Sequence, residues 1–340
     1  MATRLGINGF GRIGRAIVRC VLEQPDSEVE VVAVNDLTSA ETLAHLLEYD
    51  STYGPLDIPV RAHDDEGEAT IAVGRQLIRV LHQPDPERLP WGAMNVDIVV
   101  ESTGRFRTRD AAAAHLRAGA AKVIISAPGN GVDATIVMGI NDDTYNPERH
   151  HVLSNASCTT NCVAPMVMVL QRAFGVRRGL LTTIHSYTND QALLDGPHKD
   201  LRRARSAAVN LIPTSTGAAR AIGEVIPELA GKLDGVAVRV PVEDGSLTDL
   251  SVELDMPVTV GQVNRAFATA AEGSLKPILR YSEAPLVSRD IVGNPASCVF
   301  DADLTRAEGN LVKVFGWYDN EWGYANRTLD LVELVADYLP

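Results

Sequence analysis

One short stretch of the 340-residue sequence, "SNASCTTNCVAP", carries the residue types of nucleophilic catalysis. Cys158 stands among hydroxyl and amide side chains, directly before an apolar run that opens at Cys162. The pattern predicts a helix that begins near Cys158 with Ser157 at the cap position, and the free N–H groups and dipole of a helix start stabilise a thiolate. A small buried cysteine is the alternative role, which Cys162 fits better. Cys158 is therefore the candidate nucleophile.

A thiolate nucleophile commonly works with an imidazole. Of the eight histidines, His185 in "LLTTIHSYTND" lies at the end of a predicted strand, although a histidine there can also be structural. Cys158 and Cys162 form a single i, i+4 pair with no histidine nearby, which cannot complete a tetrahedral metal shell. His185 is therefore the candidate partner among the histidines, and no metal site is predicted.

A local cationic run lies in "HKDLRRARSAA", which contains Arg202 and Arg203 and precedes the hydroxyl-rich and glycine-containing "PTSTGAAR". The chain as a whole is acidic, with 44 acidic and 31 basic side chains, which disfavours unspecific attraction to nucleic acid or anionic membranes. The run predicts an anion pocket, with a solvated or subunit-contact loop as the alternative. Arg239 is the stronger sign, because a charge between apolar strand residues needs a partner or a ligand.

A dinucleotide fingerprint opens the chain. Gly9, Gly11 and Gly14 in "INGFGRIGR" have G-x-G-x-x-G spacing between a predicted strand and a predicted helix. Asp36 ends the second predicted strand, 36 − 14 = 22 residues beyond Gly14, where a carboxylate accepts hydrogen bonds from a ribose and repels a 2′-phosphate. The pattern favours NAD over NADP, and a tight turn followed by a solvated acid is the alternative.

The elements that must position these residues follow two patterns. In the first part short β-branched runs alternate with helical ones, which predicts a Rossmann-type, doubly wound parallel sheet. From about 179 onward long strand-like pieces joined by Pro, Asp and Gly predict an α+β domain with a mixed or antiparallel sheet. We expect an NAD-binding domain over 1–157, joined by a C-terminal helix at about 320–340, and a catalytic domain over 158–319.

The composition is that of an ordinary globular protein, with 45% hydrophobic and 22% charged residues. Four cysteines are too few for a disulfide framework, no export signal is recognised, and no apolar run approaches the roughly 18 residues of a membrane helix. These features predict a cytoplasmic protein.

Six motifs in this order resemble the glyceraldehyde-3-phosphate dehydrogenase family over the whole chain: "INGFGRIGR", "SNASCTTNC", "HSYTNDQ", "HKDLRRAR", "PTSTGAA" and "WYDNEWGYANR". The resemblance implies a homotetramer with one NAD per subunit. It also implies oxidative phosphorylation of D-glyceraldehyde 3-phosphate by inorganic phosphate to 1,3-bisphosphoglycerate, a step of glycolysis and gluconeogenesis. The loop at about 187–210 would pack near the cofactor of a neighbouring subunit.

The same resemblance implies the role of each site residue. Cys158 would form the thioester, and His185 would lower the pKa of the thiol and stabilise the oxyanion. The substrate phosphate would be held by Thr188, Arg239 and an arginine of the "LRRAR" run, for which we choose Arg203 with Arg202 left open. The attacking phosphate would be held by Ser157, Thr159, Thr216 and Gly217. The cofactor would be bound by Gly9, Gly11, Arg12, Ile13, Gly14, Asp36 and Ser126, with Asn320 on the nicotinamide amide and Tyr324 near the ring.

Two departures from the family pattern stand out. "QPDP" at 83–86 lacks an arginine that the family often has near the adenine, which puts one cofactor contact in doubt. "PVEDGSLTD" replaces the commoner "PTPNVSVVD" and brings in Glu243 and Asp244, whose purpose the sequence does not explain. The alternative function is erythrose-4-phosphate dehydrogenase, which shares "SNASCTTNC" and "DNEWG" but lacks "HSYTNDQ" in this form.

Overall fold

The computed structural model describes residues 2–65 and 67–339. Its internal contacts divide the chain into two compact units. Within the "SNASCTTNC" stretch, the boundary between the first and the second unit falls between Ala156 and Ser157. The first unit runs through Ile136 and adds Thr144–Ala156 and the chain from Ala325 onward, and the second comprises Val137–Asp143 and Ser157–Tyr324.

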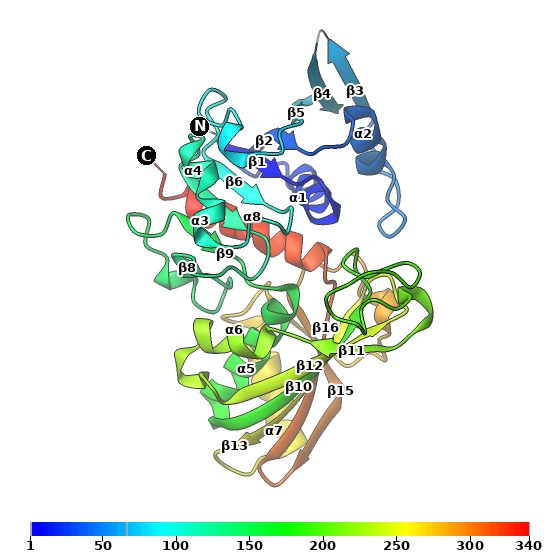
Figure 1. Ribbon diagram of the computed structural model, residues 1–340. Coiled ribbons are helices and arrows are strands. Elements are labelled where there is room, and N and C mark those ends of the chain that lie inside the picture. Colours follow the sequence, from blue (N-terminus) through cyan, green and yellow to red (C-terminus); the bar gives the residue numbers. More distant parts are fainter. Residues whose placement is uncertain (1, 66, 340) are drawn as a thin grey trace. The chain divides into compact units, whose positions relative to one another are not determined.

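A nine-stranded sheet forms the frame of the first unit, in the order β3-β4-β5-β2-β1-β6-β7-β9-β8 (Figure 1). The strands from β5 to β8 in this order pair in parallel, whereas β3, β4 and β5 pair antiparallel at one edge. The central strands are short and apolar because both of their faces are buried. The strands are β1 (Thr3–Asn8), β2 (Val29–Asn35), β3 (Val60–Asp65), β4 (Glu68–Val73), β5 (Gln76–Leu81), β6 (Ile98–Glu101), β7 (Lys122–Ile125), β8 (Ala134–Thr135) and β9 (Val152–Ser154), and the helices are α1 (Arg12–Glu23), α2 (Ala40–Glu48), α3 (Arg109–Ala112), α4 (Ala114–Arg117) and most of α8 (Trp322–Ala336).

Parallel pairing brings the carboxyl ends of four strands to one edge of this sheet. The residues that follow them are Gly9 after β1, Asp36 after β2, Ser102 after β6 and Ser126 after β7. Ligands of open α/β sheets bind at such an edge, so the fold gathers the predicted dinucleotide-binding residues there.

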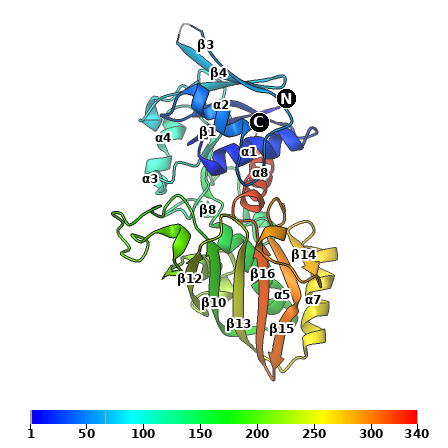
Figure 2. The same cartoon turned by 90° about the vertical axis from the view of Figure 1, so that its right-hand side faces the viewer.

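The second unit is built on a mixed seven-stranded sheet in the order β11-β12-β10-β13-β16-β15-β14 (Figure 2). Three helices pack on one face of it. The other face carries Leu180 and Val236, which are 66% and 50% exposed. The strands are β10 (Val176–Ser186), β11 (Ile212–Ser215), β12 (Leu233–Val240), β13 (Ser246–Leu254), β14 (Leu279–Ser282), β15 (Cys298–Glu308) and β16 (Leu311–Tyr318), and the helices are α5 (Cys158–Phe174), α6 (Ala218–Val225) and α7 (Val260–Glu272).

One edge of this second sheet collects the predicted catalytic side chains. Strands β10 and β12 are parallel, and β10 and β16 are both antiparallel to β13. The carboxyl ends of β10, β12 and β16 and the start of β13 therefore meet, which brings together His185, Arg239, Tyr318 and Ser246.

The predicted fold class is confirmed: a parallel-sheet α/β domain and an α+β domain with a mixed sheet. Strand β3 was not predicted, because its polar "VRAHDD" lacks an apolar pattern. The helical stretch at 109–117 is broken at Ala113 into α3 and α4, and the last helix, expected at about 320–340, runs over Trp322–Ala336.

Across residues 2–65 and 67–339, no helix combines the length and the apolar character that crossing a membrane requires.

Candidate active site

The glycine turn after β1 has the geometry that a diphosphate needs. Gly9 has φ +95°, and a Cβ there would lie 2.6 Å from the backbone nitrogen of Thr103. A Cβ on Gly14 would lie 2.4 Å from the carbonyl oxygen of Gly9, so helix α1 can approach the turn only without a side chain. Gly11, the N-cap of α1, has open space around its Cβ position and no side-chain cap. A glycine turn that leads into the start of a helix in this way is a typical site for an anion.

Asp36 lies in a pocket whose lining comes from the ends of β1, β2, β5 and β6 and the turns that follow them. Its carboxylate accepts hydrogen bonds from the backbone N–H groups of Phe10 (3.0 Å) and Thr38 (3.1 Å), which hold it in place while leaving lone pairs for a ligand. The lining residues include Asn8, Gly9, Gly11, Asp36, Leu37, Gln83, Ser102 and Arg105. The pocket fits a nucleotide whose ribose hydroxyls donate to Asp36.

A buried polar network that the sequence analysis missed lies directly beneath this pocket. Asn8 donates to Glu101 (2.6 Å), and Asn35 donates to Asn8 (2.7 Å). His115 lies 3.0 Å from Glu101 and accepts from the indole N–H of Trp91 (3.0 Å). These contacts tie β1, β2 and β6 together at their carboxyl ends. The only sequence signal was a polar residue at the end of each apolar strand.

The remaining predicted cofactor residues fall in both units. Arg12 pairs with Asp50 (2.9 Å), Ile13 is half-buried, and Ser126 donates to the carbonyl of Glu101 (3.2 Å). Asn320 and Tyr324 belong to the second unit and are 5% exposed. Gln83, in the "QPDP" stretch that lacks the family arginine, donates its backbone N–H to the Asn35 amide oxygen (2.8 Å) and accepts from the Asn35 amide N–H through its carbonyl (2.9 Å).

Cys158 is the first residue of α5, as predicted, with Ser157 as the N-cap. The Ser157 hydroxyl accepts a hydrogen bond from the backbone N–H of Thr160 (3.0 Å). Ala156, just before the cap, has φ +55°, an unusual conformation for a residue with a side chain. The thiol therefore sits at the positive end of a 17-residue helix, on a sharply turned backbone.

His185 lies against this thiol, with Nε2 3.4 Å from Sγ of Cys158. Its Nδ1 lies 2.7 Å from the carbonyl oxygen of Ser186. With its ring proton on Nδ1, His185 donates to this carbonyl, which can only accept, and the Nε2 lone pair faces the thiol. The imidazole is thus oriented as an acceptor for the thiol proton.

The pKa values of Cys158 and His185 are shifted in opposite directions. Burial raises the pKa of the Cys158 thiol to about 11, opposed by the charge of Arg239 and a hydrogen bond from Thr159. Burial lowers the pKa of His185 to about 3, and the charges of Arg239 and Arg203 add to this effect. The resemblance implies that His185 lowers the thiol pKa. In the ligand-free protein burial shifts the thiol pKa the other way, and Nε2 of His185 faces the thiol as the base that would take its proton.

Arg239 joins the imidazole to the predicted phosphate site. Its Nη1 donates to the carbonyl of Ser186 (3.0 Å) and to the hydroxyl of Thr188 (3.3 Å), and lies 2.9 Å from His185 Nδ1. Its Nε is buried and has no hydrogen-bond partner within the described residues. An orphaned guanidinium donor beside a threonine hydroxyl suits an anionic ligand.

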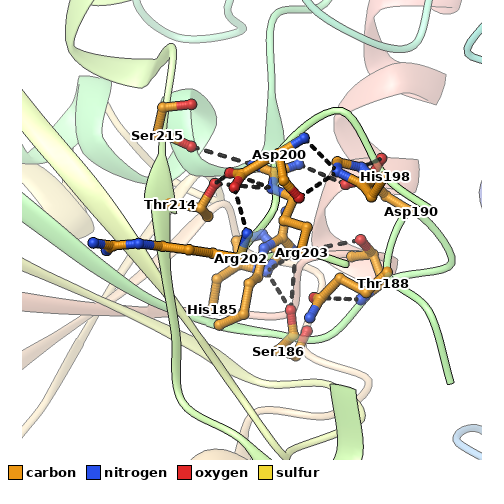
Figure 3. A network of polar contacts seen from close by, with 12 residues as sticks. His185, Ser186, Thr188, Asp190, His198, Asp200, Arg202, Arg203, Thr214 and Ser215 are labelled. Carbon is orange, nitrogen blue, oxygen red and sulfur yellow. Dashed lines mark hydrogen bonds and ion pairs between the residues drawn. The ribbon is translucent and has the colours of Figure 1, made fainter. Parts of the chain in front are cut away.

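Arg203 is held in a network of acidic and hydroxyl side chains (Figure 3). It pairs with Asp190 (2.5 Å), lies 3.8 Å from Asp200, and donates to the hydroxyl of Thr214 (2.9 Å). Its charge acts on His185 and Arg239, whereas Arg202 is exposed. The geometry favours Arg203 for the phosphate role, and Asp190, which the sequence analysis overlooked within "HSYTNDQ", is its partner in the ligand-free state.

The hydroxyls expected to hold the attacking phosphate have partners within the protein. Ser157 lies 2.7 Å from the Thr160 hydroxyl, and Thr159 lies 2.9 Å from the Tyr318 hydroxyl. Thr216 accepts from the N–H of Ala218 (3.2 Å) at the start of α6, where Gly217 is the N-cap without a side-chain cap. Tyr318, 1% exposed, also lies 2.7 Å from Thr183 and was not among the predicted residues.

The two acidic residues of "PVEDG" have separate roles. Glu243 pairs with Arg289 at the surface. Asp244 is buried and shares a hydrogen bond with Asp319, which also accepts from the N–H groups of Gly293 (2.8 Å) and Trp322 (2.7 Å). Burial raises the pKa of Asp319 despite these donors. Two carboxyl groups in such contact oppose each other's ionisation, so the pair holds a proton to higher pH than a solvated carboxyl does.

Replacing Asp244 with asparagine is expected to stabilise the protein at alkaline pH. Because the Asp319 pKa is higher in the folded than in the unfolded state, the folded protein keeps a proton that the unfolded chain releases, and stability falls as pH rises through the folded-state value. The Asn amide donates without that proton. We expect an unchanged melting temperature near pH 4 and a gain of about 1–3 kcal/mol in unfolding free energy near pH 8.

Thermal unfolding of Asp244→Asn between pH 4 and 9 measures this effect. Glu243→Gln, which changes the neighbouring exposed acid, is the matched control and should follow the parent curve. An identical pH slope in parent and Asp244→Asn would show that the two carboxyls do not share a proton.

Comparison with known proteins places this geometry in a family. The model of "Glyceraldehyde 3-phosphate dehydrogenase, NAD binding domain" matches residues 3–109, and that of its C-terminal domain matches 157–320. The glyceraldehyde-3-phosphate dehydrogenase of Geobacillus stearothermophilus is 58% identical over 337 residues, covering 99% of both chains. Those of Streptomyces coelicolor and Mycobacterium avium are each 57% identical and cover 100% of both chains. The chain belongs to the glyceraldehyde-3-phosphate dehydrogenase family.

Proposed function

We propose that this protein catalyses the NAD-dependent oxidation of D-glyceraldehyde 3-phosphate, coupled to phosphorylation by inorganic phosphate, through a thioester on Cys158. The observation that carries the proposal is the 3.4 Å contact between Cys158 Sγ and His185 Nε2 at the start of α5. Beside it lies the buried Arg239 Nε, which finds no hydrogen-bond partner among residues 2–65 and 67–339. The product is 1,3-bisphosphoglycerate, and the reaction is a step of glycolysis and gluconeogenesis.

The dyad acts first as nucleophile and base. As Sγ of Cys158 bonds to the aldehyde carbon, the thiol proton passes to Nε2 of His185, which returns it to the developing oxyanion of the hemithioacetal. Electrostatic help comes from the helix dipole at the start of α5. Bound NAD supplies the acceptor for the hydride of the hemithioacetal carbon. His185 then removes the hydroxyl proton, and an acyl thioester remains on Cys158.

The second half-reaction frees the acyl group. An oxygen of inorganic phosphate bonds to the thioester carbon, the carbon–sulfur bond breaks, and Sγ of Cys158 recovers a proton from His185. We assign the substrate phosphate to Thr188, Arg203 and Arg239. We assign the attacking phosphate to Ser157, Thr159, Thr216 and Gly217, and Arg239 would contact both phosphates. Ser157 and Thr159 can each accept from their protein partner, the hydroxyl of Thr160 or of Tyr318, and donate their own proton to the phosphate.

NAD is the cofactor, and the first unit is the domain that we assign to its adenosine and diphosphate. Support comes from the glycine turn, the open space at Gly11 and the two N–H groups that hold Asp36. Asn320 is assigned to the nicotinamide amide and Tyr324 to the ring. The second unit, which carries the dyad, is assigned as the catalytic domain.

We also propose a homotetramer. The loop between β10 and β11 exposes five large apolar side chains, which are 68% to 81% exposed: Leu193, Leu194, Leu201, Val209 and Leu211. A surface this apolar is typical of a subunit interface. Light scattering coupled to size exclusion measures the mass, and a 36.5 kDa species would contradict the assembly. The four free cysteines support a reducing, cytoplasmic location.

Steady-state rates with two aldehydes, with and without phosphate, and with two cofactors test the proposed function. We expect a higher kcat/KM for glyceraldehyde 3-phosphate than for erythrose 4-phosphate, and turnover that depends on phosphate. NAD should be preferred over NADP by about 10²-fold, because a 2′-phosphate would meet the Asp36 carboxylate. Faster turnover of erythrose 4-phosphate would favour the alternative function, and a preference for NADP would overturn the role of Asp36.

A further inference from the structure

The side chain of Asn320 is held by two serine hydroxyls. Ser186 Oγ donates to Asn320 Oδ1 at 2.8 Å, and Ser246 Oγ donates to the same oxygen at 2.7 Å. The backbone N–H of Ser186 donates to Ser246 Oγ at 3.1 Å, which closes the arrangement. Both serines are fully buried, and Asn320 is 5% exposed. The hydroxyls therefore cannot exchange these bonds for bonds to bulk water.

Proton counting decides which end of the amide faces the serines. Each buried hydroxyl must donate its proton, and Asn320 Oδ1 is the acceptor that either hydroxyl contacts within the described residues. If the amide were reversed, its NH₂ group would face the two hydroxyls, and neither hydroxyl proton would have an acceptor, which is costly in the interior. Oδ1 therefore faces the serines. The donor Nδ2 points away from them and makes no hydrogen bond within the described residues.

The three residues come from three strand ends at the catalytic edge of the second sheet. Ser186 ends β10, Ser246 begins β13, and Asn320 lies two residues after β16. The carbonyl of Ser186 also accepts from Arg239 (3.0 Å) and lies 2.7 Å from His185 Nδ1. Ser186 thus holds the catalytic imidazole with its backbone and the Asn320 amide with its side chain.

We propose that Ser186 and Ser246 are positioning residues that fix the Asn320 amide with its NH₂ group toward the carboxamide oxygen of the nicotinamide. They act through Asn320 and do not contact the cofactor. The inference rests on the proposed function in one respect, the assignment of Asn320 to the nicotinamide. It follows that the affinity contributed by the nicotinamide half of NAD depends on two buried hydroxyls.

Calorimetric titration of the full chain with NAD and with ADP-ribose, which lacks the nicotinamide, separates this role from a general structural one. In Ser186→Ala and Ser246→Ala we expect the Kd for NAD to rise about fivefold each, and more in the double variant, because an unrestrained amide loses its preferred orientation. The Kd for ADP-ribose should stay unchanged. Ser186→Thr, which keeps a hydroxyl, should recover most of the NAD affinity.

Thr183→Val is the matched control. Thr183 is a buried hydroxyl residue of the same strand, β10, and contacts Tyr318 rather than Asn320. It should lower the melting temperature while leaving the ratio of the NAD and ADP-ribose constants unchanged. The melting temperature of every variant is measured alongside, and the single variants decide the question if the double variant does not fold.

Asn320→Asp distinguishes failure of this inference from failure of the proposed function. A carboxylate still accepts from both serines but has no donor for the cofactor. If Asn320→Asp leaves the NAD to ADP-ribose ratio unchanged, the assignment of Asn320 to the nicotinamide is wrong. If Asn320→Asp changes the ratio and the serine variants do not, or if they weaken both ligands equally, the positioning role is overturned.

Discussion

Replacing Cys158 with serine is expected to abolish NADH formation while leaving NAD binding intact. A serine hydroxyl does not ionise near neutral pH and is a poor leaving group from an acyl intermediate. The first half-reaction therefore loses its nucleophile, and the second loses its leaving group. Loss of an enzyme nucleophile costs about 10⁴-fold or more in kcat. The Kd for NAD should change little, because the nucleotide pocket is lined by residues of the first unit.

Stopped-flow absorbance at the NADH band measures the first turnover, and calorimetry measures NAD binding. Cys162→Ser is the control: Cys162 lies one turn further along α5, is fully buried, and contacts the carbonyl of Gly316 (3.6 Å). It should retain turnover and lose some thermal stability. Undiminished turnover in Cys158→Ser would dispose of the proposed nucleophile.

The second large effect is expected from His185→Asn, a loss of about 10²–10⁴-fold in kcat. The variant lacks the Nε2 lone pair that lies 3.4 Å from the thiol, so the thiolate must form without an internal base. Because burial raises the pKa of Cys158 to about 11, the thiolate is scarce at neutral pH. The residual activity and the rate of iodoacetamide alkylation should both climb steadily with rising pH.

The pH dependence of kcat and of alkylation between pH 6 and 10 provides the measurement. His63→Asn, which replaces an exposed histidine on β3, is the control and should behave as the parent. If the alkylation rate of His185→Asn equals that of the parent protein at every pH, His185 is not the base.

Much of the fold could be predicted because its signals are local. The alternation of short apolar runs with helical ones identifies the parallel sheet, and the cap residue Ser157 before an apolar helix identifies the start of α5. The polar strand β3 escaped prediction because its pairing with β4, rather than any pattern of its own, makes it a strand.

The candidate site was predictable only where a motif is contiguous. Cys158, His185 and Asp36 stand out by their neighbours in the chain. Asp190 as the partner of Arg203 depends on a loop that brings together residues 13 positions apart. The direction of the Cys158 pKa shift could not be predicted, because it depends on burial of the thiol, and the polar neighbours of Cys158 in the sequence do not indicate a buried side chain.

By itself, the sequence determined the fold class and predicted the nucleotide-binding turn, the candidate nucleophile and its candidate base, since each is carried by a motif of residues close together in the chain. Only the tertiary structure decided how these groups are oriented and charged. Ser186 meets Ser246 across 60 residues and Asn320 across 134, and Asp244 meets Asp319 in the interior. Such contacts arise from the register of antiparallel strands, which the packing of the whole core sets.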